Sequence, residues 1–217
     1  MKKVVSFLIL FSIVLVFAEL PQTYISLTEP AKYYSLSKLL DGRMSTRNFS
    51  NKPLTLTDVS TLLWSADGIT ASGKHRTIPS AGALHPLEIY IHISNVKDVK
   101  PGVYRYSREK NAIELISDGD KRQEIIGNAV RQEWIKEASA LILITSVKSK
   151  TESKYKERSG KFVYLEGGAA MQNVYLMAES LGLGTCAVGS FDEVKIKKIF
   201  SLKDNEEPII LMPIGSI

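Results

Sequence analysis

The chain has 217 residues, 44% of them hydrophobic, and a formal net charge of +5. This length suits one domain with a substantial core and leaves little room for a second. Its basic residues are not interleaved with aromatic residues, which argues against a nucleic-acid-binding surface, and its single cysteine, Cys186, excludes an intramolecular disulfide.

The first 18 residues have the pattern of a targeting segment. Lys2 and Lys3 precede an apolar run from Val4 to Phe17, and the small residue Ala18 follows. A basic start, a short apolar stretch and a small residue are typical of a signal peptide, here cleaved after Ala18. Residues 1–18 are therefore predicted to direct export to the periplasm or the outside, and residues 19–217 to form the domain. An uncleaved membrane anchor or a buried core helix is the alternative.

A short basic motif follows an apolar segment that ends at Leu40. Arg43, Ser45 and Arg47 are spaced two residues apart, so in an extended backbone their side chains project to one face. Two guanidinium groups and a hydroxyl suit a phosphate and a polyol chain, because arginine offers paired, planar donors to phosphate oxygens. The alternative is an ordinary basic surface loop.

A small-residue segment precedes the first clear strand pattern. Pro79, Ser80, Ala81 and Gly82 leave main-chain amides uncovered, so the segment could lie against a planar ring and hydrogen-bond its edge. An ordinary tight turn before a strand is the alternative.

The hydrophobic periodicity predicts alternating helices and strands. Apolar residues recur at helical spacing from Leu56 to Ala66, and Thr55 with Asp58 approximates a capping box at the start of that helix. Apolar and polar residues alternate from Leu87 to Ile93, which predicts a half-buried strand. The remaining predictions are a hairpin of Val103–Tyr106 and Ala112–Ile116, a helix over Lys121–Ala129, a buried strand over Ala138–Val147, a long helix over Gly160–Leu181 ended by Gly182, a short helix over Val194–Phe200 and a closing strand over Pro208–Ile214.

Together these elements predict an α+β domain with a mixed, largely antiparallel sheet flanked by helices. Basic residues are concentrated between Lys148 and Lys161. They form either a solvated surface or a strip that attracts an anionic ligand. The adjacent amides of Gln172 and Asn173, in an otherwise apolar helix, need hydrogen-bond partners if they are buried, and interhelical or backbone bonds are the simplest expectation.

A second small-residue segment, Ala187 to Ser190, follows the long helix and a glycine turn. It could present an amide to a ring nitrogen, or it could be a plain connection that leads to Asp192. With these motifs in view, the chain resembles the FMN-dependent nitroreductase family, and more closely its branch of SagB-type dehydrogenases and azoline oxidases. The resemblance covers roughly Leu39 to Gly215 and rests on four motifs in register: RMSTRNF, PSAGALHPLEIYI, GVYRY, and EGGxxxQN followed by LGLGTCAVGSFD.

The resemblance implies an intertwined homodimer that holds two FMN molecules at its interface. It implies that one subunit holds the phosphate, ribityl chain and pyrimidine edge of a flavin, and that the partner approaches the same flavin with a small-residue segment. An amide then faces flavin N5, and an arginine stabilises the reduced, anionic flavin. The implied contacts are Arg43, Ser45 and Arg47 of one subunit, Pro79, Ser80, Ala81 and Gly82 of the other, and the segment Ala187, Val188, Gly189 and Ser190, with Gly189 at N5.

The implied activity is hydride or electron transfer through flavin N5, to or from a small organic molecule or a peptide, with NAD(P)H as a possible electron donor. Lys154 and Tyr155 resemble the Lys and Tyr pair that azoline oxidases use for proton removal. The chain lacks the basic C-terminal tail of many relatives, so the phosphate must be held by Arg43, Arg47, Arg158 or Lys161. No metal site is expected. The alternative function is an exported flavin-binding protein of the same fold without turnover.

Overall fold

The computed structural model describes residues 24–28 and 35–217. The predicted leader, residues 1–18, lies outside the described residues. Within them, seven strands form one sheet in the order β1-β4-β3-β2-β5-β7-β6, and every neighbouring pair is antiparallel. The strands are β1 (Tyr24–Ser26), β2 (Leu87–Ile93), β3 (Gly102–Ser107), β4 (Ala112–Asp118), β5 (Ala140–Ser146), β6 (Leu183–Thr185) and β7 (Glu207–Ser216).

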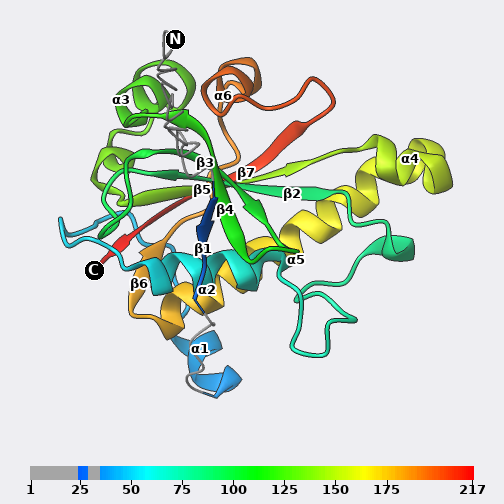
Figure 1. Ribbon diagram of the computed structural model, residues 1–217, viewed down its shortest axis with the longest axis horizontal. Coiled ribbons are helices and arrows are strands. Elements are labelled where there is room, and N and C mark those ends of the chain that lie inside the picture. The colour runs from blue at the N-terminus through cyan, green and yellow to red at the C-terminus, as the bar shows by residue number, and fades with distance from the viewer. Residues whose placement is uncertain (1–23, 29–34) are drawn as a thin grey trace, which may run out of the picture.

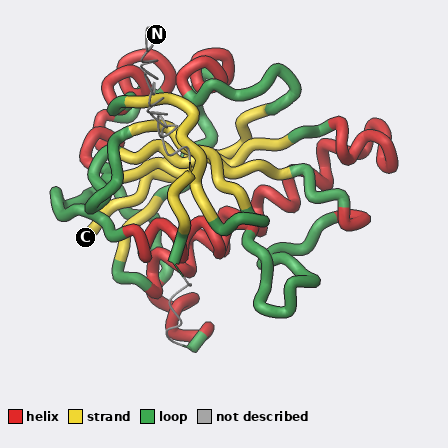
Figure 2. The backbone as a smooth tube through the Cα atoms, in the orientation of Figure 1, coloured by secondary structure: helices red, strands yellow, loops and turns green. Residues whose placement is uncertain are grey.

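Helices cover both faces of the sheet (Figures 1 and 2). One face packs against α2 and α5, and the other against α3, α6 and the turns between residues 125 and 137. The helices are α1 (Leu36–Gly42), α2 (Leu56–Asp67), α3 (Arg122–Glu124), α4 (Ser149–Tyr155), α5 (Ser159–Ser180) and α6 (Glu193–Ile199). The predicted α+β class and its largely antiparallel sheet are confirmed.

Local chemistry sets the ends of the two longest helices. At the start of α2, Thr55 Oγ1 accepts a hydrogen bond from the amide of Asp58 (3.1 Å), and Asp58 Oδ2 accepts one from the amide of Thr55 (2.8 Å). This is the predicted capping box, which satisfies two donors that the helix itself leaves unpaired. After α5 the chain turns at Gly182, whose φ of +67° is a conformation that glycine adopts without strain.

Strand β2 differs from the prediction, because all seven of its residues are buried. The polar positions face the second layer of helices and turns, and each finds a partner there or in the sheet. Tyr90 donates to Glu206 Oε2 (2.6 Å), and His92 Nε2 accepts from the amide of Lys121 (2.9 Å). The alternation of apolar and polar residues along β2 therefore reflects two buried faces of different polarity, and neither face is exposed to solvent.

The predicted helix over Lys121–Ala129 is also corrected. It is a single turn, α3, followed by a π-helical turn at Ile125–Ala129. The predicted long helix, short helix and closing strand are present as α5, α6 and β7, each within two residues of its predicted bounds at either end. No helix in the described part of the chain combines the length and the apolar character that a membrane span requires.

A buried ion cluster joins the end of α2 to β2 and to the turn after β3. Arg108 donates to Asp67 Oδ2 (2.7 Å), to Glu88 Oε2 (3.2 Å) and to the carbonyl of Leu87 (2.6 Å). Lys150 of α4 reaches Glu88 Oε1 at 3.0 Å, and Arg105 reaches its Oε2 at 3.2 Å. Burial alone would raise the pKa of Glu88, but these basic neighbours outweigh it and lower that pKa to about 2.

Candidate functional site

The predicted basic motif forms an extended segment between α1 and the chain that leads to α2. The amide of Thr46 donates to the carbonyl of Thr185 (2.8 Å), which holds the segment against the short strand β6. The guanidinium carbon of Arg43 lies 5.4 Å from the centre of the Tyr175 ring, and Ser45 Oγ lies 2.9 Å from the Tyr175 hydroxyl. Arg47 has a different neighbour, because its guanidinium lies 5.9 Å from the ring of Trp134.

Tyr175 of α5 connects this segment to the second small-residue segment. Its hydroxyl accepts a hydrogen bond from the amide of Ala187 (2.7 Å). Because a hydroxyl oxygen can accept two hydrogen bonds and donate one, it also bonds Ser45 Oγ, and either of these two hydroxyl groups can be the donor. We call Arg43, Ser45, Tyr175 and Ala187 the arginine cluster. It places two motifs that are 130 or more residues apart in the sequence next to each other.

Beyond Ala187 the backbone becomes available to a ligand. Val188 still pairs with Leu211 through two backbone bonds of 2.8 and 3.0 Å, whereas Gly189 and Ser190 are exposed. Among the described residues, none accepts a hydrogen bond from the amide of Gly189, and a Cβ added there would meet no atom within 4 Å. The amide of Gly189 is therefore an exposed donor, two residues beyond Ala187 of the arginine cluster, with no acceptor among the described residues.

The arginines of the motif have no carboxylate partner in the described part of the chain. No Asp or Glu oxygen lies within 4 Å of the guanidinium of Arg43 or Arg47. Two unneutralised guanidinium groups, a hydroxyl and a free amide are a donor set that fits a phosphate, a polyol and the edge of a heteroaromatic ring. The residues present therefore fit the flavin that the sequence predicted.

The segment Pro79–Gly82 is held by a buried carboxylate on α5. Glu166 Oε1 accepts hydrogen bonds from Ser80 Oγ (3.0 Å) and from the amide of Ala81 (2.8 Å). Ser80 Oγ in turn accepts from the amide of His85 (2.8 Å). Burial raises the pKa of Glu166 despite the two bonds that favour its charged form.

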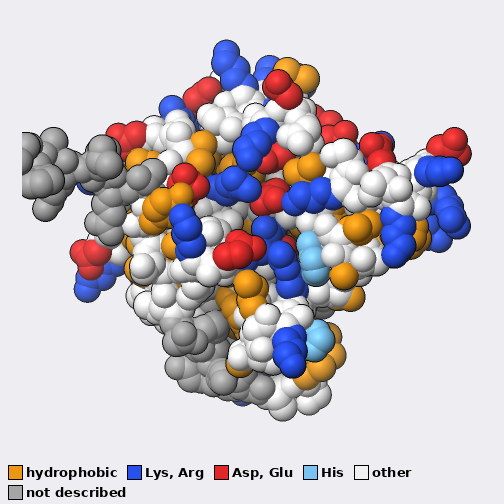
Figure 3. Space-filling view, turned by 45° about the vertical axis from the view of Figure 1, so that its right-hand side comes forward, with side chains coloured by type: hydrophobic (Ala, Val, Ile, Leu, Met, Phe, Trp, Pro, Cys, Tyr) orange, Lys and Arg blue, Asp and Glu red, His pale blue; other side chains and the backbone are white. Residues whose placement is uncertain are grey.

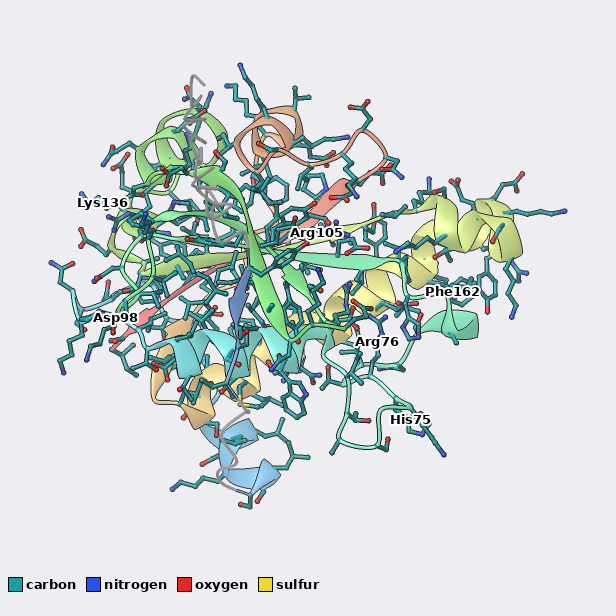
Figure 4. The ribbon with its side chains drawn as sticks, in the orientation of Figure 1. His75, Arg76, Asp98, Arg105, Lys136 and Phe162 are labelled. Atoms are coloured by element: carbon teal, nitrogen blue, oxygen red, sulfur yellow. The ribbon has the colours of Figure 1, made fainter. Side chains whose placement is uncertain are left out.

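Lys154 and Tyr155, at the end of α4, lie against this segment. A Cβ added to Gly82 would be 2.9 Å from Lys154 Nζ and 3.1 Å from the Tyr155 hydroxyl, and Gly82 has a φ of +62°. The Tyr155 ring packs on Phe162, labelled in Figure 4, with ring centres 4.2 Å apart. We call Ser80, Ala81, Gly82, Lys154, Tyr155 and Glu166 the Ser80 cluster.

The two clusters lie on opposite faces of α5. Glu166 and Tyr175 are nine residues apart on this helix, which is two and a half turns and about 13 Å along its axis. Asn173, on the same side as Glu166, donates to the carbonyls of Ser65 (3.0 Å) and Thr77 (3.1 Å), the backbone bonding that the sequence led us to expect. Within one chain, a ligand that lies on one face of α5 cannot contact both clusters.

Comparison with known families shows to which family this chain belongs. The family model described as "Nitroreductase family" matches residues 40–216, which include both clusters. The chain belongs to the nitroreductase family. Its members are oxidoreductases, so the family assignment supports an oxidoreductase here as well.

Individual relatives agree with the family assignment. This nitroreductase-family chain is 40% identical over 180 residues to "Putative nitroreductase MJ1384" of Methanocaldococcus jannaschii, a match that covers 83% of the chain and 90% of the relative. The crystal structure of "a putative nitroreductase" from Ralstonia eutropha JMP134 superposes with a TM-score of 0.75 at 28% identity, and the match covers 90% of each chain.

Two further similarities are more distant. The trifolitoxin-processing protein TfxB of Rhizobium leguminosarum bv. trifolii is 26% identical over 139 residues, which are 61% of this chain and 37% of that protein. The NADPH:FMN oxidoreductase of Vibrio harveyi, solved with NAD+, shares the fold with a TM-score of 0.59 at 17% identity, over 83% of this chain and 67% of that one.

The sequence assigned no role to two residues on which the candidate site depends. Tyr175 is the hub of the arginine cluster, and Glu166 is the acceptor that holds the Ser80 cluster. Glu166 was visible as the first residue of the EGGxxxQN motif, without a role of its own, and Tyr175 resembled a core residue, which its 7% exposure supports. Cys186 is buried.

Proposed function

We propose that this nitroreductase-family protein is an FMN-dependent oxidoreductase that transfers hydride or electrons through flavin N5. The observation that carries the proposal is the Tyr175 hydroxyl. It joins Ser45 to Ala187 beside Arg43, whose guanidinium has no carboxylate partner among the described residues. This linkage supports one continuous ligand surface built from two sequence-predicted motifs.

The arginine cluster, Arg47 and Gly189 have distinct tasks in this proposal. Arg43 or Arg47 holds the phosphate, and Ser45 holds the ribityl chain. The exposed amide of Gly189 donates to N5, and a guanidinium near the pyrimidine edge stabilises the negative charge of the reduced ring. The bound flavin supplies the redox chemistry, and the protein supplies position and electric field.

We further propose that two copies of the chain build each site. Because Glu166 and Tyr175 project from opposite faces of α5, the Ser80 cluster needs a second copy to meet the flavin held by the arginine cluster. Large apolar side chains are exposed near both clusters, which supports a covered face: Leu36 (61%), Leu40 (52%), Met44 (65%), Tyr164 (66%) and Leu165 (61%).

The branch and substrate class are also proposals. Lys154 Nζ and the Tyr155 hydroxyl both approach Gly82, so they could accept or deliver a proton at a substrate stacked on the flavin. This geometry, the motif resemblance and the similarity to the trifolitoxin-processing protein TfxB favour the SagB-type branch, with a small organic molecule or a peptide as the proposed substrate. NAD(P)H is the proposed electron donor. Export after cleavage of residues 1–18 stays a prediction.

The flavin proposal is tested by the visible spectrum of purified protein that has been mixed with FMN and freed of excess ligand. A flavin spectrum that bleaches anaerobically with NADH or NADPH is expected. A colourless protein contradicts the proposal. A yellow protein that no donor reduces would favour the alternative, a flavin-binding protein without turnover.

The composite site is tested by mixing two variants that are each defective in one cluster. The Arg43→Ala/Arg47→Ala variant lacks the phosphate contacts, and Gly82→Val disrupts the opposite segment through its positive φ. In a mixed dimer, one site carries both defects and the other carries neither. We expect one FMN per two chains in the mixed dimer and almost none in either parent. Absence of recovery in an isolated mixed dimer would contradict the two-chain site.

The proton role of Lys154 and Tyr155 is tested separately. Lys154→Ala and Tyr155→Phe should lose turnover with the physiological substrate while they retain FMN, because neither belongs to the arginine cluster. Flavin content, measured after denaturation, is the internal control. Full turnover in both variants would contradict the role.

A further inference from the structure

A cleft with basic walls adjoins the Ser80 cluster. It has a volume of about 690 Å³ and is formed by the chain between Ile69 and His85, which leads from α2 to β2. Its basic lining residues are Lys74, His75, Arg76 and His85, and no Asp or Glu lines it. Figure 4 shows His75 and Arg76 on the loop at the lower right, and Figure 3 shows Lys or Arg side chains close to the histidines of this face.

Arg76 is fixed in this wall by its buried partner. Its Nη1 donates to Asp67 Oδ2 at 3.1 Å, and the side chain of Asp67 is only 2% exposed. Asp67 also neutralises Arg108, so one carboxylate serves two guanidinium groups. Arg76 therefore keeps part of its positive charge available to the cleft.

The other side of Arg76 is weakly paired. The nearest carboxylate to its Nη2 is Glu109, at 3.9 Å, whose side chain is 69% exposed. That distance is too long for a hydrogen bond, and an exposed ion pair contributes little. Nη2 therefore makes no hydrogen bond to this carboxylate, and the bond that Nη1 makes fixes Arg76 in the wall between this cleft and a neighbouring one lined by Glu109.

The cleft has an apolar part as well. Ile69, Ile78, Pro79 and Ala83 line it together with Ser80. Burial, together with the charge of Arg76, lowers the pKa of His85 and so favours its neutral form, and Lys74 and Arg76 bring positive charge to the lining. An apolar wall next to two cations suits a molecule with a hydrophobic body and one anionic group.

We propose that this cleft binds the anionic group of an apolar organic acid. If the proposed function holds, this acid is the oxidising substrate, because Pro79 and Ser80 line the cleft and also belong to the segment that is proposed to lie beside the flavin. Lys74 and Arg76 are then the residues that determine specificity. They select a carboxylate over the neutral amide of the same shape.

Benzoate and benzamide form the matched pair of probes, since they have the same shape and differ in charge. Calorimetric titration of the purified protein, without turnover, gives the dissociation constant of each. We expect benzoate to bind at least tenfold more tightly than benzamide at low salt, and this preference to fall as salt is added. Equal binding of the two probes would overturn the proposal.

Variants assign the preference to the cleft. Lys74→Ala, at an exposed position, should weaken benzoate binding three- to tenfold and leave benzamide unchanged. Arg76→Gln should weaken benzoate binding further. The melting temperature of this variant shows how much stability is lost with the hydrogen bond to Asp67. Lys97→Ala removes an exposed charge beside Asp98, on the opposite side of the molecule in Figure 4, and should change nothing. An equal loss in Lys97→Ala and Lys74→Ala would overturn the assignment.

A kinetic comparison separates this inference from the proposed function. In the flavin-loaded enzyme, Lys74→Ala should raise KM for 4-nitrobenzoate. It should leave KM for 4-nitrobenzamide and the rate of reduction by NADPH unchanged. A loss confined to NADPH would overturn the substrate role. A protein that holds no flavin but still binds benzoate through Lys74 would contradict the proposed function and leave the anion cleft standing.

Discussion

Replacing Tyr175 by Phe tests the connection on which the proposed flavin site depends. The substitution keeps the ring that packs near Arg43 and removes only the hydroxyl. Two hydrogen bonds are lost, one of 2.7 Å from the amide of Ala187 and one of 2.9 Å with Ser45 Oγ. The amide of Ala187 is then left without its acceptor.

The expected loss of stability follows from these two bonds. An ordinary hydrogen bond contributes about 1 kcal/mol, and a donor left unsatisfied costs about 1–3 kcal/mol. Because Ala187 is half-buried, we expect Tyr175→Phe to lower the free energy of unfolding by about 2 kcal/mol. With a urea m-value of about 2 kcal/mol/M, the unfolding midpoint falls by about 1 M.

Urea unfolding followed by circular dichroism measures the shift, and titration with FMN measures the second consequence. FMN binding should weaken, since the segments that carry Ser45 and Gly189 are no longer joined. Tyr24→Phe is the control, because it removes a hydroxyl from a side chain that is 37% exposed and belongs to neither cluster. If both variants unfold at the same midpoint and bind FMN equally, the hydroxyl does not join the two segments and the reasoning is refuted.

Three other predictions concern the ion cluster, the Ser80 cluster and α5. The pKa of Glu88 is lowered from 4.5 to about 2, so its stabilisation of about 3 kcal/mol is complete above pH 4.5 and is lost as the pH falls toward 2. When the free energy of unfolding is measured against pH, its decrease over this range should be smaller in Glu88→Gln than in the unchanged protein. Gly82→Ala should weaken FMN binding about tenfold in a fluorescence titration, because φ is +62° there, whereas Gly168→Ala, a helical position with open space, should bind normally. Asn173→Leu leaves two backbone carbonyls without a donor and should lower the melting temperature, by an amount equivalent to about 1–3 kcal/mol; an unchanged melting curve would show that these bonds contribute nothing.

Much of the fold could be predicted because its signals are local. The capping box at Thr55, the long apolar helix and the glycine that ends it all depend on residues within a few positions of one another. Strand β6 and helix α4 escaped prediction, because three and seven residues carry too little periodicity. The burial of β2 on both faces could not be predicted either, since it depends on distant elements that pack over Tyr90 and His92.

In the candidate site, too, the local features could be predicted and the long-range contacts could not. Its motifs were visible as runs of small or basic residues, but their partners were not. Glu166 is 86 residues from Ser80, and Tyr175 is 130 residues from Ser45. No local pattern reports a pairing over such separations. The grouping of Lys154 with Gly82 likewise required coordinates, because it depends on how α4 returns toward the turn before β2.

The opposite placement of Glu166 and Tyr175 on α5 limits how this gene can change. Surface substitutions along the helix leave the angle between the two side chains intact. One inserted or deleted codon between positions 166 and 175 would rotate one of them by about 100° and shift it by about 1.5 Å relative to the other. Length variation among natural homologues should therefore avoid this interval and accumulate in the loops on either side of the helix.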